Sequence, residues 1–207
     1  MELVRRSAIE RRAEAIGVSV TPELAGRLEA YLSLLFRWNA RMNLTAVRDE
    51  KTAVDRLLLE GVVAAELLEG SAPRVMDVGS GAGSPAIPMH LALAGSRLML
   101  VEARQRKAAF LREAARVLGL ERVTVAACRV EELPAQETVR ADVVSSRGVR
   151  VDALLASTVG RLAEPEACWL VFGGEAPPGG GGWEVERSVE LPGDDAGRLW
   201  LASKKRI

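Results

Sequence analysis

The chain has 207 residues, of which 48% are hydrophobic and 27% are charged. This composition is typical of a globular protein with one good core and excludes a disordered chain. The 28 basic and 28 acidic residues balance, which argues against binding nucleic acid by bulk attraction alone and leaves a local basic patch open. No apolar run is long enough to span a membrane and no signal peptide is visible. We therefore expect a cytoplasmic protein without a membrane partner.

Three residues bear on metal and redox chemistry. The single histidine, His90, and the two well-separated cysteines, Cys128 and Cys168, argue against a zinc site, so we expect no metal. The cysteines lie in apolar stretches and are expected to be reduced thiols in the core. His90 falls inside a predicted helix, where we expect it to be structural.

The first third of the chain is predicted to be helical. Apolar residues with helical spacing end at Gly17 and predict a first helix. Thr21-Pro22-Glu23 combines a capping hydroxyl with a proline in the first turn, which predicts the start of a second helix. A third helix is expected from about residue 52 to residue 68. Together these helices form an expected N-terminal extension over residues 1–70.

Strands and helices alternate after Pro73. The predicted strands are 74–78, 97–102, 122–127, 141–146 and 167–172, and the predicted helices are 85–94, 104–118 and 151–162. Such alternation indicates an α/β fold with a Rossmann-like, mostly parallel sheet. A Gly-rich stretch between Glu175 and Trp183 is expected to be a flexible loop. Strand-like segments at 183–191 and 198–203 predict a C-terminal antiparallel hairpin, so we expect a second domain over residues 71–207.

The most informative motif lies at residues 75–85, Val-Met-Asp-Val-Gly-Ser-Gly-Ala-Gly-Ser-Pro. A buried strand that ends in an acidic residue and a Gly-rich turn opens a nucleotide-shaped crevice in α/β folds. A dinucleotide fingerprint needs glycine at its sixth position, where this chain has Ser84. The loop therefore favours a nucleoside cofactor without a pyrophosphate, such as S-adenosylmethionine, over NAD or FAD. Its candidate cofactor-binding residues are Asp77, Gly79, Ser80, Gly81, Gly83 and Ser84.

Polar residues follow the neighbouring strands at the same edge of the sheet. Glu102 is placed to accept hydrogen bonds from a ribose, with a solvated carboxylate as the alternative. Val130 and Glu131 follow the third strand, where the loop flanks an adenine. Arg147 closes the fourth strand and needs an anionic or hydrogen-bonding partner, which leaves a functional role or a structural ion pair open. We expect it to bind a phosphate, a carboxylate or a guanine carbonyl oxygen.

Several motifs together resemble one known family. They are Trp38-Asn39 followed by Met42-Asn43-Leu44-Thr45-Ala46, the glycine loop with Pro85, Ile87 and Pro88, Arg106-Lys107 with Phe110-Leu111, Arg129-Val130-Glu131-Glu132, and Ser146-Arg147. The chain resembles the bacterial glucose-inhibited division protein B family, the small-subunit ribosomal RNA guanine-N7 methyltransferases. The resemblance covers nearly the whole chain from about Tyr31.

The resemblance implies a methyltransferase that uses S-adenosylmethionine and acts on small-subunit ribosomal RNA. We separately expect a monomer. It places Gly79 and Ser84 at the methionine end of the cofactor and Arg147, the expected catalytic residue, beside the transferred methyl group. Further implied cofactor contacts are Glu102, Ala103, Arg104, Val130 and Glu131. The expected RNA-binding residues are Arg37, Asn39, Arg41, Asn43, Arg106 and Lys107.

Several positions depart from the family pattern. The family has a bulky apolar residue at Ser84, glycine at Ala86, histidine at Leu57, Asp-Ser at Glu60-Gly61 and lysine at Phe172. We expect these departures to fall on the RNA-facing and catalytic side more than on the cofactor loop. They keep two alternatives open: a diverged relative that methylates another nucleic acid or a small molecule, and a cofactor-binding module without turnover. An NAD-dependent oxidoreductase is disfavoured by the glycine spacing.

Overall fold

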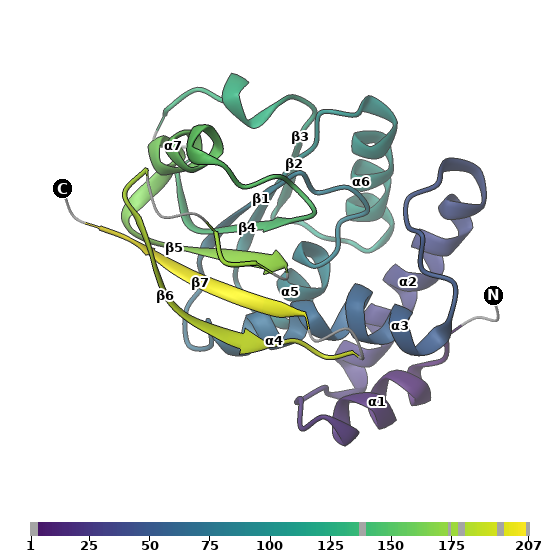
Figure 1. Cartoon of the computed structure of the whole chain (residues 1–207). Coiled ribbons are helices and arrows are strands. Elements are labelled where there is room, and N and C mark those ends of the chain that lie inside the picture. Colours follow the sequence, from purple (N-terminus) through teal and green to yellow (C-terminus); the bar gives the residue numbers. More distant parts are fainter. Residues whose placement is uncertain (1–3, 137–139, 174, 178–180, 194–196, 206–207) are drawn as a thin grey trace.

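A computed structural model describes residues 4–136, 140–173, 175–177, 181–193 and 197–205. The described residues form a seven-stranded sheet of order β3-β2-β1-β4-β5-β7-β6 (Figure 1). Strands β1 to β5 are parallel, and β7 runs antiparallel to both of its neighbours. The predicted α/β fold, with a mostly parallel Rossmann-like sheet and a C-terminal hairpin, is confirmed. The strands are β1 (Arg74–Val78), β2 (Arg97–Val101), β3 (Val123–Ala126), β4 (Ala141–Arg147), β5 (Ala163–Gly173), β6 (Trp183–Glu190) and β7 (Arg198–Lys204).

The helices begin where the sequence offers capping groups. The Thr21 hydroxyl accepts a hydrogen bond from the Leu24 amide, and Pro22 occupies the first turn. The Asp49 carboxylate accepts from the Thr52 amide, so the third helical stretch begins at Glu50, earlier than expected. That stretch continues through a π-helical turn. The helical segments are α1 (Arg6–Ala15), α2 (Pro22–Met42), α3 (Glu50–Val54), the π turn η1 (Asp55–Leu59), α4 (Glu60–Glu66), α5 (Ala86–Ala92), α6 (Gln105–Val117), the 3-10 turn η2 (Val130–Glu132) and α7 (Ala153–Leu162).

Each face of the sheet has its own core, because side chains alternate along the strands. Val75, Leu98 and Leu100 point to the side covered by the helices from α1 to α6. Met76 and Val101 point to the opposite side, which α7 covers (Figure 1). Among the described residues, no helix combines the length and apolar character needed to cross a membrane.

Two local expectations need correction. Strand β5 begins at Ala163 rather than at residue 167, because Ala163 already pairs with Ala141 of β4. Among the described residues β7 pairs with β5 from Cys168 onward, so Pro165 lies outside this pairing, where its missing amide hydrogen is tolerated. The two free cysteines are half-buried at the margins of the core rather than inside it.

Two other expectations concern the Gly-rich loop and the division of the chain into domains. The expected flexible loop between Glu175 and Trp183 lies partly outside the described residues. The division of the chain into residues 1–70 and 71–207 stays a prediction.

Candidate active site

The glycine loop after β1 is shaped by close backbone approaches. The amides of Gly79 and Ser80 donate to the Val101 carbonyl at 2.9 and 3.1 Å, which ties the loop to the end of β2. Gly79 has a φ of +74°, and a Cβ built on it would lie 2.4 Å from Cγ1 of Val149. Any other residue there would collide with the segment that follows β4. Glycine at position 79 therefore brings the ends of β1, β2 and β4 together.

The Glu102 carboxylate is fixed at this point of convergence. Its Oε2 accepts from the Gly81 amide at 2.9 Å, and its Oε1 accepts from the Arg104 amide at 2.8 Å. Only 7% of the residue is exposed. Each carboxylate oxygen can accept a further hydrogen bond, so two oriented acceptors remain for vicinal hydroxyl groups.

The N-terminal part of the chain holds the loop from the other side. The buried Tyr31 hydroxyl, on α2, donates to the Ala82 carbonyl at 2.8 Å. Burial raises the pKa of this hydroxyl far above its ordinary value, so it stays a donor. The helical extension thus shapes the glycine loop directly.

These elements enclose a cavity of about 540 Å³, which we call the glycine-loop cavity. Seven of the predicted cofactor-binding residues line it, and so does the predicted RNA-binding residue Lys107. The lining consists of Leu44, Thr45, Ala46, Val47, Arg56, Leu57, Gly79, Ser80, Gly81, Ala82, Ser84, Glu102, Arg104, Lys107, Arg147, Gly148 and Val149.

Other predicted cofactor-binding residues lie off this lining. Asp77 is buried below the loop and accepts from the Ser145 hydroxyl at 2.6 Å; its burial raises its pKa to about 6. Gly83 is buried, and a Cβ on it would lie 2.5 Å from Cδ1 of Ile87. Val130 is buried in the core on the α7 side. Direct cofactor contact by these residues, and by the exposed Ala103 and Glu131, stays a prediction.

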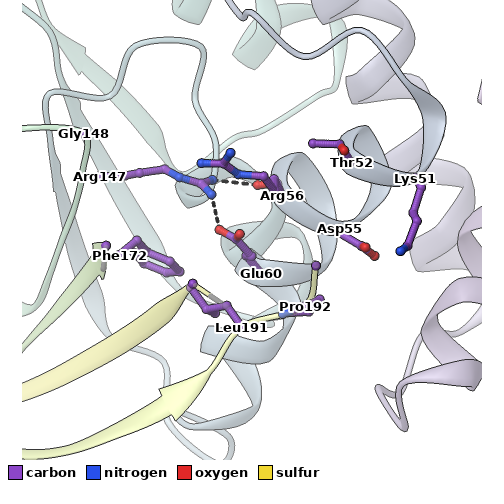
Figure 2. Close-up of a pocket in the computed structure, with 13 residues that line it drawn as sticks. Lys51, Thr52, Asp55, Arg56, Glu60, Arg147, Gly148, Phe172, Leu191 and Pro192 are labelled. Carbon is purple, nitrogen blue, oxygen red and sulfur yellow. Dashed lines mark hydrogen bonds and ion pairs between the residues drawn. The ribbon is translucent and has the colours of Figure 1, made fainter. Parts of the chain in front are cut away.

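Arg147 reaches from the end of β4 across to the helical segment 55–60 (Figure 2). Its Nη1 donates to the Arg56 carbonyl at 2.6 Å and to the Ser84 hydroxyl at 3.3 Å, and its Nη2 donates to the Glu60 carboxylate. Burial lowers the pKa of Arg147 and raises that of Glu60 to about 7, while the opposite charge of each partner works against these shifts. In this structure Arg147 binds a carboxylate, one of the partners that the sequence predicts.

A second cavity lies on the other side of Arg147. It measures about 690 Å³, and we call it the Glu60 cavity. Arg56, Arg147 and Gly148 line both cavities and so form a partition between them. Figure 2 shows the Glu60 cavity with Phe172 and Leu191 beside the carboxylate. Its lining consists of Lys51, Thr52, Asp55, Arg56, Glu60, Arg147, Gly148, Phe172, Gly173, Leu191, Pro192, Gly193 and Gly197.

The sequence analysis missed the Glu60–Arg147 pair. It identified Glu60 only as a departure from the family pattern, in which an aspartate stands. Two features of the sequence could have indicated the pair: Glu60 is acidic like the aspartate of the family pattern, and Arg147 needs a counter-charge. A single sequence does not show that Glu60 and Arg147 are in contact, because they lie far apart along the chain.

Comparison with known proteins identifies the family. A sequence profile described as rRNA small subunit methyltransferase G, GidB, matches residues 25–178. The chain belongs to this family. A protein named ribosomal RNA small subunit methyltransferase G from Neisseria gonorrhoeae is 35% identical over 98% of this chain and 99% of its own length. One of the same name from Halorhodospira halophila is 37% identical over 82% of this chain and 79% of its own length.

A solved structure supports the same fold. A SAM-dependent methyltransferase from Aquifex aeolicus superposes with a TM-score of 0.60 at 16% identity, covering 84% of this chain and 98% of that protein. Identity at this level shows the fold alone. The predicted resemblance and the predicted assignment as a methyltransferase are both confirmed by the family match.

One family departure has a packing cause. A Cβ on Gly61 would lie 2.4 Å from the Pro85 carbonyl and 2.9 Å from the Met89 amide, so α4 packs directly on the start of α5. Glycine at position 61 therefore has a packing role, and its expected place on the RNA-facing and catalytic side stays a prediction. Leu57 and Phe172 do reach the cavities, the first at the glycine loop and the second beside Glu60.

Two of the predicted RNA-binding residues make local structural contacts. Asn39 Oδ1 accepts from the Thr45 amide at 2.9 Å, and Asn43 ends α2 in the left-handed conformation with a φ of 50°. Both shape the segment that lines the glycine-loop cavity. Trp38 packs edge-on against Phe110 with ring centroids 5.7 Å apart, which joins α2 to α6.

The other four predicted RNA-binding residues are charged and differ in exposure. Arg37, Arg41 and Arg106 are exposed, and Lys107 is half-buried. RNA binding by the six predicted residues stays a prediction. Among the described residues, no group of three His, Cys, Asp or Glu side chains gathers as metal ligands do.

Proposed function

We propose that the chain transfers a methyl group from S-adenosylmethionine to N7 of a guanine in small-subunit ribosomal RNA. The observation that carries this proposal is the pair of adjoining cavities, with a fixed carboxylate in one and Arg147 between them. Family membership and the printed names of the relatives support the same substrate class. A ribosomal RNA substrate implies that the enzyme works in the cytoplasm.

The glycine-loop cavity fits an adenosyl cofactor. Gly79 and Gly81 offer backbone without Cβ atoms, and the Glu102 carboxylate presents oriented acceptors for the two ribose hydroxyl groups. Ser84 replaces the glycine that a pyrophosphate-binding turn needs, which disfavours a dinucleotide. When bound, S-adenosylmethionine supplies a methyl group on a positively charged sulfur.

Methyl transfer to N7 of guanine requires the protein to orient the reactants rather than to transfer a proton. N7 of guanine carries a lone pair and no proton, so no general base is needed, and in-line alignment of the two reactants is the main contribution. Positive charge appears on the guanine ring as it reacts, and an unbalanced arginine nearby would oppose this. Glu60 balances the charge of Arg147, so the guanidinium can lie next to the reacting base.

Two measurements test this proposal. Calorimetry should show binding of S-adenosylhomocysteine and none of NAD. Tritiated methyl transfer to unmodified small ribosomal subunits should then give 7-methylguanosine on digestion, detected by mass spectrometry. Absence of 7-methylguanosine from the labelled RNA would overturn the proposal.

A second candidate is methylation of another nucleic acid. It is favoured by Leu57 and Phe172, since neither apolar side chain offers the hydrogen bonds of the histidine and lysine found in the family. It predicts cofactor binding with label on other RNA or DNA and none on ribosomal subunits. A binding module without turnover predicts cofactor binding and no label on any nucleic acid.

A further inference from the structure

We infer that Glu60 and Arg147 together select guanine as the target base, which they read in the Glu60 cavity. In this arrangement Glu60 accepts hydrogen bonds from the ring N1–H and the exocyclic amino group, and Arg147 donates to the O6 carbonyl. The inference rests on the proposed function and adds the residues that recognise the base.

The pair presents an acceptor and a donor side by side. Arg147 Nη2 meets Oε2 of Glu60, and within the part of the chain that the structure describes no donor is bonded to Oε1 (Figure 2). Arg147 has five N–H donors, and its described contacts are the Arg56 carbonyl, the Ser84 hydroxyl and the Glu60 carboxylate. Each member of the pair therefore retains hydrogen-bonding capacity, and both line the same cavity.

Guanine has the complementary order of groups. Its O6 acceptor stands beside the N1–H donor and the amino donor, whereas adenine places an amino donor beside an N1 acceptor. An acceptor next to a donor therefore fits guanine and mismatches adenine at both positions. Because O6 and N7 share one edge of guanine, a base whose O6 meets Arg147 turns N7 toward the partition with the glycine-loop cavity.

The surroundings increase the energetic effect of a mismatch. Glu60 is 3% exposed, and the apolar side chains of Phe172 and Leu191 line the same cavity at 4% and 7% exposure. In such a place a hydrogen bond to a charged group contributes more than one between neutral groups, and a polar group left unpaired destabilises the complex. Enzymes that act on a base commonly read its Watson–Crick edge in this manner and stack the ring on apolar side chains.

Replacement of the target guanosine by inosine tests the contact with Glu60. Inosine keeps O6, N1–H and N7 and lacks only the exocyclic amino group. Once mass spectrometry has located the methylated nucleotide, small-subunit RNA carrying guanosine or inosine there is assembled and its single-turnover methylation is measured. We expect the wild-type protein to methylate the inosine substrate about 10- to 100-fold more slowly, the equivalent of one hydrogen bond to a charged acceptor.

Variants of Glu60 test whether this residue causes the slower methylation of the inosine substrate. In Glu60→Ala the guanosine-to-inosine ratio should fall to about unity, and in Glu60→Gln it should lie between this value and that of the wild type. Glu69→Ala removes an exposed carboxylate just beyond α4 and should keep the wild-type ratio. Calorimetry with S-adenosylhomocysteine checks that each variant is folded. If Glu60→Ala does not fold, Glu60→Gln and the wild-type comparison decide.

The outcomes separate this inference from the proposed function. Equal rates for inosine and guanosine in the wild type, or an undiminished penalty in the Glu60 variants, would overturn base selection by Glu60 while methylation of guanosine stands. No methylation of the guanosine substrate by the wild type would overturn the proposed function itself.

Discussion

Arg147 is tied to its surroundings in three directions, by Ser84, by the Arg56 carbonyl and by Glu60. A buried ion pair is weak evidence for stability, because desolvation of the two charges offsets their attraction. The side chains of Arg147 and Glu60 are only 20% and 4% exposed, so this ion pair bears most of that desolvation cost. A costly pair between two cavities is consistent with a role in the reaction.

Replacement of Arg147 should separate catalysis from cofactor binding. We expect Arg147→Ala to reduce single-turnover methylation by at least about tenfold. The affinity for S-adenosylhomocysteine should change less, because Glu102 and the glycine loop keep their own hydrogen bonds. Arg140→Ala, just before the opposite end of β4, is the control. Near-wild-type turnover by Arg147→Ala would remove this residue from the mechanism.

The Glu60 carboxyl makes stability depend on pH. Burial raises its pKa from 4.5 to about 7, against the charges of Arg147 and Arg56 and with a smaller contribution from Asp55. The folded state therefore holds this proton more tightly than the unfolded state, so the free energy of unfolding falls as pH rises through 7. Asp77 acts in the same direction only up to about pH 6, and His90 in the opposite direction only between about pH 4 and 6.5.

Urea titrations of the wild type and of Glu60→Gln between about pH 6.5 and 8 isolate this effect by their difference, because the smaller contributions of Asp77 and His90 are common to both proteins. Over that range the wild-type protein should lose less than about 1 kcal/mol of unfolding free energy, and Glu60→Gln should show a flatter profile. A wild-type stability that rises over the same range would contradict a raised pKa at Glu60.

At the scale of elements, the contact between α4 and α5 sets the position of the site. Glu60 and Gly61 are neighbours: the first carries the carboxylate, and the second faces the start of α5. Glycine at position 61 permits the close approach that holds α4 beside the glycine loop. The π-helical turn before α4 contains Arg56, whose carbonyl binds Arg147.

Two helical glycines give a matched test of this packing. Gly61→Ala places a methyl group 2.4 Å from the Pro85 carbonyl and should lower the free energy of unfolding by about 1–3 kcal/mol. Gly26→Ala, in α2, meets only Arg6 Cδ at 4.0 Å and should raise it by about 0.5–1 kcal/mol through better helix propensity. Urea denaturation measures both variants. Equal effects of the two substitutions would contradict the packing role of Gly61.

At the scale of the whole molecule, charge is balanced overall and positive groups must act locally. The 28 basic and 28 acidic residues give no net attraction for RNA. Arg104 and Lys107 line the glycine-loop cavity, and Arg106 is exposed on the same helical turn. We expect these residues to bind RNA phosphates next to the cavity.

RNA binding should therefore depend steeply on salt. The logarithm of the binding constant should fall linearly with the logarithm of the salt concentration, and Arg106→Ala or Lys107→Ala should each reduce the slope by about 1. Arg116→Ala, at the other end of α6 and paired with Glu113 at 2.8 Å, should leave the slope unchanged. Filter binding or fluorescence anisotropy measures these slopes, and a salt-independent wild type would contradict the patch.

Local signals were enough to predict most of the fold. Strand β1, the glycine loop and the C-terminal hairpin follow from hydrophobic runs, glycines and turn residues that lie close together in sequence. Boundaries shifted where a partner decided them, as when pairing with β4 extended β5 back to Ala163. Propensity alone has no information about such a partner.

The sequence by itself determined the α/β fold, the glycine loop, Glu102 at the end of β2 and the family, because each depends on residues within a short window or on a motif. Only the tertiary structure decided that Arg147 pairs with Glu60, 87 positions away, that Gly61 serves packing, and that two cavities meet at one arginine. These features arise where separate strands and helices converge. Their energies come from burial and from contacts across the fold, which no local pattern of residues encodes.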